Sequence, residues 1–129
     1  MLARLLIAAL FLGVAFAAYA AWKRPPRRLS RLDLAELGVR GPAIVQFSMQ
    51  NCAPCRAAVP HLTAAADAAD VGYEHVDLDE RPDLAQRYGI RTVPTIVVAA
   101  GSGEILGKWT RLPQNGEVSE AAEKARAAT

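Results

Sequence analysis

The sequence predicts a small α/β domain, with a central sheet of about four strands flanked by helices, and one transmembrane helix that precedes it. Three observations indicate this. An uncharged run covers residues 5–22, strand-like and helix-like periods alternate from residue 33 onward, and the only two cysteines form a Cys-Ala-Pro-Cys motif at 52–55. A chain of 129 residues has room for one globular domain with its own core.

The apolar run is long enough to cross a bilayer, because its 18 residues would extend about 27 Å as a helix. One basic residue, Arg4, precedes the run, and five follow it: Lys23, Arg24, Arg27, Arg28 and Arg31. This distribution predicts a retained single-pass anchor, with a basic border against anionic lipid and with the domain on the cytoplasmic side. The alternative is a cleaved secretory signal and an exported domain, since residues 18–20 (Ala-Tyr-Ala) have the form of a cleavage site.

The chain therefore divides into three predicted segments. Residues 1–23 are the transmembrane anchor or signal sequence, residues 24–32 are a basic Pro-rich linker, and residues 33–129 are the folded domain. Residues 32–129 hold nine basic and thirteen acidic side chains, which is a net charge of −4. Such a domain has no basic surface for nucleic acid, so we expect no nucleic-acid partner.

The expected elements follow one another in a simple order. They are a short helix at 33–38, a strand at 42–47, a helix from 52 to 69, a strand at 73–78, a short helix at 82–88, strands at 93–100 and 104–109, and a helix at 117–128. No internal repeat is present. One strand and one helix thus flank the cysteine motif directly.

The first elements follow from end signals and periodicity. Asp33 is able to cap the first helix and Gly38 to end it. The apolar run at 42–47, broken only by Gln46, is typical of a central strand that is covered on both faces. In the next helix, inward-facing positions recur at three- and four-residue steps: Val59, Leu62, Ala66 and Ala69. Pro60 lies within this helix and is expected to kink it.

Glycine and proline delimit the later elements. Gly89 closes the helix at 82–88, and Pro94, a residue normally excluded from sheet interiors, interrupts the start of the strand at 93–100. The Gly-Ser-Gly run at 101–103 predicts a tight reversal, so the last two strands should form a hairpin. The final Ala-rich helix is expected to direct these side chains inward: Val118, Ala121 or Ala122, and Ala125.

The spacing of Cys52 and Cys55 predicts a dithiol with chemistry of its own. If Cys52 opens a helix, Cys55 lies at i+3 on the same face, close enough to form a disulfide. The positive end of the helix favours a thiolate at Cys52, which makes it a usable nucleophile at neutral pH. Pro54 has the fixed φ angle that suits the first helical turn.

The motif has two other interpretations. A zinc site needs two more cysteine or histidine ligands, and the only histidines are His61 and His75. His61 follows Cys55 by six residues, which turns it about 240° around the helix and away from the sulfurs. A purely structural disulfide is the second alternative. The motif favours redox chemistry, and we expect no metal.

Residues 33–128 resemble the thioredoxin family. The matching features are the strand at 43–47 leading into Cys-Ala-Pro-Cys, Pro60 five residues beyond the second cysteine, Val-Asp-Leu-Asp at 76–79, and Tyr-Gly-Ile-Arg-Thr-Val-Pro-Thr at 88–95. The resemblance implies a thioredoxin-like fold with a mixed sheet. With its N-terminal apolar run, the chain is similar to membrane-tethered thioredoxin-like proteins of the bacterial cell membrane.

The resemblance also implies roles for particular residues. Cys52 attacks a partner disulfide, and Cys55 resolves the mixed disulfide. Substrate-binding positions are Ala53, Pro54, Val93 and Pro94, with a cis bond before Pro94 and the backbone of Val93 pairing with an extended substrate segment. No cofactor is implied beyond the redox-active disulfide. The implied partners are disulfide-containing proteins and an electron donor such as a thioredoxin reductase-type protein.

The chain departs from the family pattern near the dithiol. Ser48 and Asn51 stand where the family has tryptophans, and Gln46 stands where thioredoxins commonly carry a buried acid. Gln46 and His75 are candidate modulators, since a neutral imidazole can accept a proton; the simpler interpretation of His75 is a partly buried strand residue without a catalytic role. The remaining polar groups are expected to be solvated surface: His61, Asp77, Asp79, Glu80 and Asp83.

Three functions are consistent with these features. The first is a protein thiol–disulfide oxidoreductase, which would act as a reductant in the cytoplasm. If the domain is exported, an oxidase, an isomerase or a cytochrome-maturation reductase becomes the expectation. The other two functions are a tethered binding module that uses the groove beside Pro94, and a redox sensor that signals through its own disulfide with little turnover.

Overall fold

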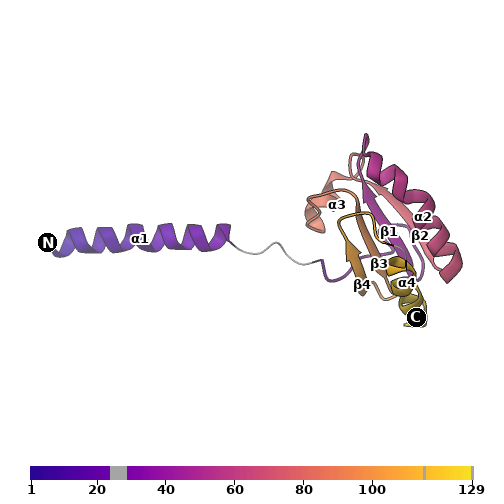
Figure 1. Ribbon diagram of the computed structural model, residues 1–129. Helices are drawn as coiled ribbons and strands as arrows, with labels where there is room; N and C mark the ends of the chain where they lie inside the picture. The colour runs from indigo at the N-terminus through magenta and orange to yellow at the C-terminus, as the bar shows by residue number, and fades with distance from the viewer. Residues whose placement is uncertain (24–28, 115, 129) are drawn as a thin grey trace.

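The computed structural model describes residues 1–23, 29–114 and 116–128 (Figure 1). Its elements are α1 (Leu2–Trp22), β1 (Ala43–Ser48), α2 (Ala53–Ala69), β2 (Gly72–Asp77), α3 (Pro82–Arg87), β3 (Thr95–Ala99), β4 (Ile105–Trp109) and α4 (Glu117–Ala127). From β1 onward, the order of strands and helices is the predicted one. Strand β3 starts two residues later than expected, directly after Pro94, which has no N–H to donate to the sheet.

The four strands form one mixed sheet in the order β2-β1-β3-β4. Strands β1 and β2 are parallel, β3 runs antiparallel to β1, and β3 and β4 form the expected antiparallel hairpin. All six residues of β1 are buried, which confirms a central strand covered on both faces. The sheet is therefore the expected mixed sheet of four strands, with β1 leading directly to the cysteine motif.

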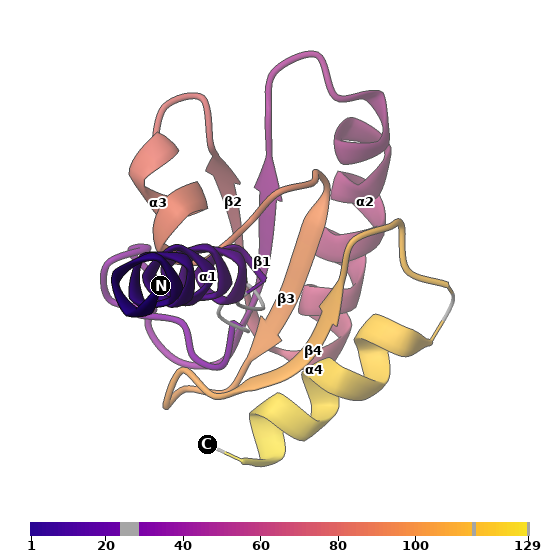
Figure 2. The ribbon, with the colours of Figure 1, turned by 90° about the vertical axis from the view of Figure 1, so that its left-hand side faces the viewer.

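Helices cover both faces of the sheet (Figure 2). Ala43, Val45 and Phe47 of β1 join one hydrophobic cluster, which includes Leu84 of α3. Ile44 points the other way, into a cluster made by α2 and α4. The alternation of side chains along β1 thus separates an α3 face from an α2–α4 face. The inward positions predicted for α4 are buried: Val118, Ala121, Ala122 and Ala125.

The inward face of α2 differs by one position from the expected one. Its buried residues are Cys55, Ala58, Leu62, Ala66 and Ala69, and Val59 is only half-buried. Cys55 points inward, and Ala58, three residues later, lies on the same face of the helix. Val59 is therefore turned partly away from the core. Pro60 lies inside the helix as predicted, and the hydroxyl of Thr63 donates to the carbonyl oxygens of Val59 (2.8 Å) and Pro60 (3.1 Å). The expected kink stays a prediction.

Residues 33–38 do not form the predicted helix. They form consecutive turns, in which Asp33 Oδ1 accepts a hydrogen bond from the Glu36 N–H at 3.2 Å, as a capping residue does. Leu34 and Leu37 are buried on one side of these turns. The segment ends at Gly38 with φ 75°, a left-handed conformation through which a helix does not continue.

The folded domain starts before the predicted boundary at residue 33. Leu29 packs against the α3-side cluster, Leu32 is 2 % exposed, and Arg31 pairs with Glu104 in an isolated bridge. The N–H of Leu32 also donates to the carbonyl oxygen of Gly103 at 2.9 Å. The last residues of the predicted linker therefore belong to the packed domain, and residues 24–28 of that linker lie outside the described residues.

Helix α1 is long and apolar enough to cross a membrane. It has 21 residues, and its most apolar window has a mean hydropathy of 2.2. None of its residues is buried. A secretory signal sequence has the same length and composition, so both predicted interpretations of this segment are consistent with the helix.

Candidate active site

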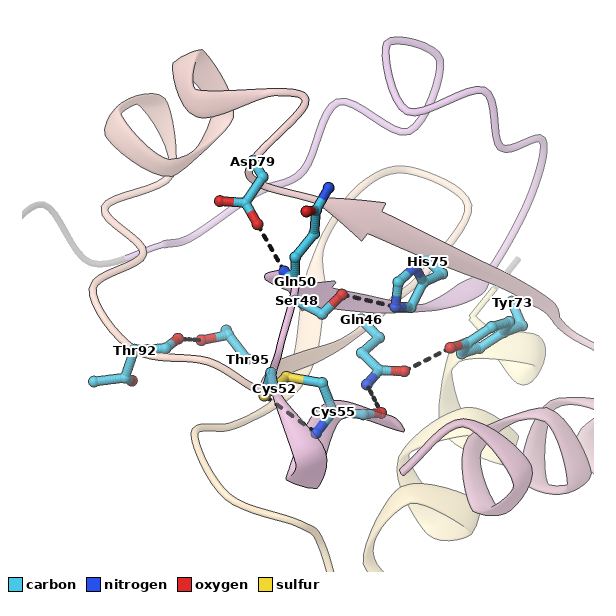
Figure 3. The surroundings of a disulfide bond; sticks show 10 residues. All are labelled: Gln46, Ser48, Gln50, Cys52, Cys55, Tyr73, His75, Asp79, Thr92 and Thr95. Carbon is cyan, nitrogen blue, oxygen red and sulfur yellow. Dashed lines mark hydrogen bonds between the residues drawn. A yellow bond between two sulfur atoms is a disulfide. The ribbon is translucent and has the colours of Figure 1, made fainter. Parts of the chain in front are cut away.

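The two cysteines form a disulfide at the beginning of α2 (Figure 3). Cys52 is the N-cap of the helix, with extended φ and ψ angles of −97° and 100°, and its Sγ accepts a hydrogen bond from the Cys55 N–H at 3.2 Å. Pro54 lies in the first turn, as predicted. Asn51, with φ 60°, turns the chain from β1 into the helix, in a conformation that asparagine tolerates better than most residues. The pair therefore lies where the helix end favours a thiolate.

The two sulfurs differ in their access to solvent. Cys55 is 2 % exposed, whereas Cys52 is half-buried and its neighbours Ala53 and Pro54 are exposed. A disulfide or a thiol-reactive reagent from solvent can thus reach Cys52 more easily than Cys55. Access of this kind is one of the factors that decide which thiol of a pair attacks first.

The segment before β3 lies at the same end of the sheet as the dithiol. Thr95 pairs with Phe47, near the end of β1 that leads to Cys52. The Val93–Pro94 bond is cis, as the resemblance implied, Pro94 is buried, and Val93 is half-buried. The Thr95 hydroxyl donates to the Thr92 carbonyl oxygen at 2.7 Å and so braces this turn.

A groove of about 400 Å³ runs from this turn toward α3. Its lining residues are Met49, Leu78, Asp79, Pro82, Ala85, Ile90, Arg91, Thr92 and Val93. Met49 is 44 % exposed and contributes an apolar side chain to the groove. Val93 is thus at once next to the cis proline and on the wall of a mainly apolar groove.

Gln46 is fully buried beneath the disulfide and has partners at both ends of its amide. Its Nε2 donates to the Cys55 carbonyl oxygen at 2.7 Å, and its Oε1 accepts from the Tyr73 hydroxyl at 2.5 Å (Figure 3). Burial, together with the neighbouring Glu74 carboxylate, raises the pKa of Tyr73 to about 12. The Tyr73 hydroxyl therefore stays protonated at neutral pH, and neither side chain takes up a proton there.

Ser48 and His75 form a second polar pair on the same face of the sheet. The Ser48 Oγ and His75 Nε2 atoms are 2.7 Å apart, Ser48 is buried, and His75 is exposed. The expectation that His75 is partly buried is therefore wrong. The pair borders a hollow of about 320 Å³ that Cys55 also lines.

The acidic cluster is less uniform than the sequence predicted. Asp79 is exposed, but its Oδ2 accepts a hydrogen bond from the Gln50 N–H at 2.6 Å and so holds the loop between β1 and Cys52. Asp77 is half-buried, and its Oδ1 accepts from the Asp79 N–H at 2.8 Å. Asp83 is solvated, and its hydrogen bond with Arg81 lowers its pKa. Asp79 is thus a structural residue of the site that the sequence did not reveal.

In the described ranges, no three or more His, Cys, Asp or Glu side chains are placed to hold a metal ion. His61 lies exposed on α2 and lines a different hollow, together with Leu112 and Pro113. His61 and His75 are therefore available as a matched pair for mutagenesis, one beside the dithiol and one away from it.

Sequence reasoning named the cysteines and Pro94 as site residues but did not predict two contacts beside them. Neither the Tyr73–Gln46 bond nor the Ser48–His75 bond was expected, although Gln46 and His75 were both named. The signal for them is the alternation along parallel strands: Gln46 and Ser48 lie on one face of β1, and Tyr73 and His75 on the matching face of β2. Polar residues on a face that is otherwise apolar indicate partners across the strands.

Comparison with known proteins agrees with this fold. The thioredoxin family model matches residues 35–122. Thioredoxin-2 of Pyricularia oryzae is 41 % identical over 56 residues, which are 43 % of this chain and 33 % of that protein. Thioredoxin H2 of Arabidopsis thaliana is 38 % identical over 63 residues, 48 % of this chain and 47 % of that protein. The chain thus spans between a third and about half the length of these curated relatives.

Solved structures give the same result over more of the chain. A mutant thioredoxin from Halobacterium salinarum superposes with a TM-score of 0.63 at 25 % identity, covering 77 % of this chain and 88 % of the other. The oxidized form of mitochondrial thioredoxin 3 from Saccharomyces cerevisiae has a TM-score of 0.55 at 25 % identity, covering 74 % of this chain and 86 % of the other.

Proposed function

Since the chain belongs to the thioredoxin family, we propose that it is a thiol–disulfide oxidoreductase that exchanges disulfides with partner proteins. The observation that carries the proposal is the Cys52–Cys55 disulfide at the beginning of α2, with Cys52 accessible and Cys55 buried. This arrangement supplies one sulfur for attack on a partner and a second sulfur within reach of the first.

The reaction proceeds in two exchanges. In the reduced domain, the Cys52 thiolate attacks one sulfur of a partner disulfide, and the other partner sulfur leaves as a thiolate. Cys55 then loses its proton and attacks the Cys52 sulfur, which forms the Cys52–Cys55 bond and releases the second partner sulfur. The partner gains two electrons and the dithiol loses two. A dithiol donor, such as a thioredoxin reductase-type protein, returns the electrons.

The proposed substrate is an extended segment around a disulfide of a partner protein. The exposed residues Ala53 and Pro54 directly follow Cys52, and the turn at Val93 and Pro94 lies at the same end of the sheet. The apolar groove continues from Val93 toward α3. An extended chain can pair its backbone with an exposed peptide group and place side chains in such a groove. The chemistry needs no cofactor other than the disulfide itself.

We propose that α1 anchors the domain to a bacterial cell membrane in a single pass, with the domain in the cytoplasm. Its length and hydropathy suit a membrane span, and the five basic residues at its C-terminal side favour retention of that side in the cytoplasm. An alkaline phosphatase fused to the C-terminus should then be inactive. An active fusion would place the domain outside the cytoplasm.

Reduction of insulin by dithiothreitol tests the proposed activity. The full chain in detergent micelles should accelerate insulin precipitation well above the rate of dithiothreitol alone. The matched control is the double variant Cys52→Ser/Cys55→Ser, which should give the background rate. A tethered binding module that does not use its dithiol would give the background rate with both proteins, and that result would refute the proposed activity.

A further inference from the structure

The Ser48–His75 pair lies on the sheet face that carries the dithiol. In the parallel register of β1 and β2, Gln46 pairs with His75 and Ser48 with Asp77, so Ser48 and His75 are diagonal neighbours. Figure 3 shows their side chains pointing toward one another, and their Oγ and Nε2 atoms are 2.7 Å apart. A buried hydroxyl is thus joined to a solvent-exposed imidazole.

The hollow beside this pair is lined by Cys55 and by several polar side chains. Among its lining residues are Ser48, Cys55, Arg56, His75 and Asp77, and its volume of about 320 Å³ is ample for water. Cys55 is 2 % exposed and is one of the residues that line this hollow, together with polar side chains. The hollow therefore offers a path for a proton between the Cys55 thiol and the imidazole.

The other groups around the hollow are poorer proton acceptors near neutral pH. The Gln46 amide accepts no proton, and the Tyr73 hydroxyl keeps its own because burial raises its pKa to about 12. Arg56, on α2, is a cation throughout. Asp77, on β2, has its Oδ1 occupied by the Asp79 N–H. An imidazole is the group that changes charge between pH 5 and 8.

We propose that His75, acting through Ser48, accepts the proton of Cys55 when Cys55 resolves a mixed disulfide. The proton leaves the Cys55 sulfur, passes by way of water in the hollow and the Ser48 hydroxyl, and arrives on His75 Nε2. The Cys55 thiolate then bonds to the Cys52 sulfur, and the partner sulfur leaves with the electron pair of the broken bond. Ser48 is the positioning residue of this path. The inference rests on the proposed function.

Reaction of the reduced full chain with 5,5′-dithiobis(2-nitrobenzoic acid) separates the two exchanges. Attack by Cys52 releases the first thionitrobenzoate, and resolution by Cys55 releases the second, so stopped-flow absorbance gives two phases. In detergent micelles between pH 5.5 and 8.5, His75→Ala should leave the first phase unchanged and slow the second by about a hundredfold, the lower end of general-base effects. Added imidazole should restore part of the second phase.

Three further variants make the result specific. His61→Ala is the matched control and should match the wild type in both phases, because His61 lies away from the hollow. His75→Gln keeps a hydrogen-bonding side chain but accepts no proton, so it should be as slow as His75→Ala. Ser48→Ala should slow the second phase while leaving the first unchanged.

Distinct outcomes would overturn the inference and the proposed function. A second phase in His75→Ala with the wild-type rate and pH profile would refute the role of His75. Recovery of the wild-type rate by His75→Gln would reduce that role to hydrogen bonding and also refute proton acceptance. A wild-type protein that releases no second thionitrobenzoate would contradict the proposed exchange chemistry itself.

Discussion

The Tyr73 hydroxyl fixes the orientation of the Gln46 amide by donating to its Oε1 at 2.5 Å, which leaves Nε2 to donate to the Cys55 carbonyl oxygen at 2.7 Å. Strand β2 is thereby tied through β1 to the first turn of α2. The buried position beneath the dithiol thus holds a neutral, fully oriented amide, and the pH dependence of the dithiol has to come from other groups.

Removing the Tyr73 hydroxyl should weaken this tie. Tyr73→Phe leaves Gln46 Oε1 without its donor, so we expect the free energy of unfolding to fall by about 1 kcal/mol at pH 7, measured by guanidinium unfolding of the full chain. The folded-state pKa of Tyr73, about 12, lies above the ordinary value of 10.0. The stabilisation linked to its proton is therefore present below pH 10 and is lost as pH rises through about 12.

A spectrophotometric titration at 295 nm checks that the pKa of Tyr73 is raised. The difference between wild type and Tyr73→Phe should be one tyrosine that ionises with a midpoint near pH 12. If the tyrosine signal that Tyr73→Phe lacks had its midpoint near pH 10 in the wild type, the account of Tyr73 burial would be contradicted.

Replacing Gln46 by an acid should make the fold sensitive to pH. In Gln46→Glu, one carboxyl oxygen faces the Cys55 carbonyl oxygen, and burial further favours the protonated form, so the pKa of the new group is raised. A raised folded-state pKa gives stability that is present at low pH and is lost as pH rises through it. We expect the variant to be close to wild type at pH 4 and about 2 kcal/mol or more less stable at pH 8.

Gln46→Leu is the control for this effect, because it removes both hydrogen bonds without adding a titrating group. Its loss of stability should be the same at pH 4 and pH 8, again measured by guanidinium unfolding. If the Glu and Leu variants lost unfolding free energy with the same dependence on pH, position 46 would not be buried in the way described.

The strands and the long helices were predictable because their signals are local. The apolar run of β1, the three- and four-residue steps of α2 and the Gly-Ser-Gly reversal each lie within a short stretch of sequence. The conformation of the segment at 33–38 was not predictable, because a capping aspartate and two leucines suit successive turns as well as a helix. Packing of Leu32 beside Gly103, far along the chain, decides where the domain begins.

The contrast between local signals and long-range contacts also separates the cysteine motif from the two polar pairs beside it. Cys52 and Cys55 are recognisable because their motif is contiguous. The Gln46–Tyr73 and Ser48–His75 bonds each join residues 27 positions apart, and they exist only in the observed parallel register of β1 and β2. A shift of that register by one residue would move all the β2 partners to the other face, so these bonds depend on the pairing of two separate segments and not on one contiguous motif.

Asp79 should stabilise the loop that leads to the dithiol. Asp79→Ala removes the acceptor for the Gln50 N–H, so we expect hydrogen exchange at that amide to accelerate by about tenfold, corresponding to about 1.4 kcal/mol. Glu80→Ala, which changes an exposed neighbouring acid, should leave the exchange rate unchanged. Equal exchange at Gln50 in all three proteins would contradict the assigned role of Asp79.

Gly103 should tolerate no side chain, because the segment around Leu32 lies against it. Gly103 has φ 90°, and an added Cβ would overlap the Leu32 carbonyl oxygen. Gly116 has the same φ of 90° but open space around the corresponding position. Gly103→Ala should therefore cost about 2 kcal/mol more unfolding free energy than Gly116→Ala. Equal losses in guanidinium unfolding would mean that residues 29–32 are not packed on the domain.

Trapping of a mixed disulfide tests the central claim most directly, namely that Cys52 attacks and Cys55 resolves. Reduced Cys55→Ser protein is mixed with insulin, and the products are separated without reductant and analysed by mass spectrometry. The account predicts a stable covalent complex through Cys52 in Cys55→Ser and little or none in Cys52→Ser, because Cys55 is buried. Absence of a complex in Cys55→Ser, or an equal yield from Cys52→Ser, would contradict it.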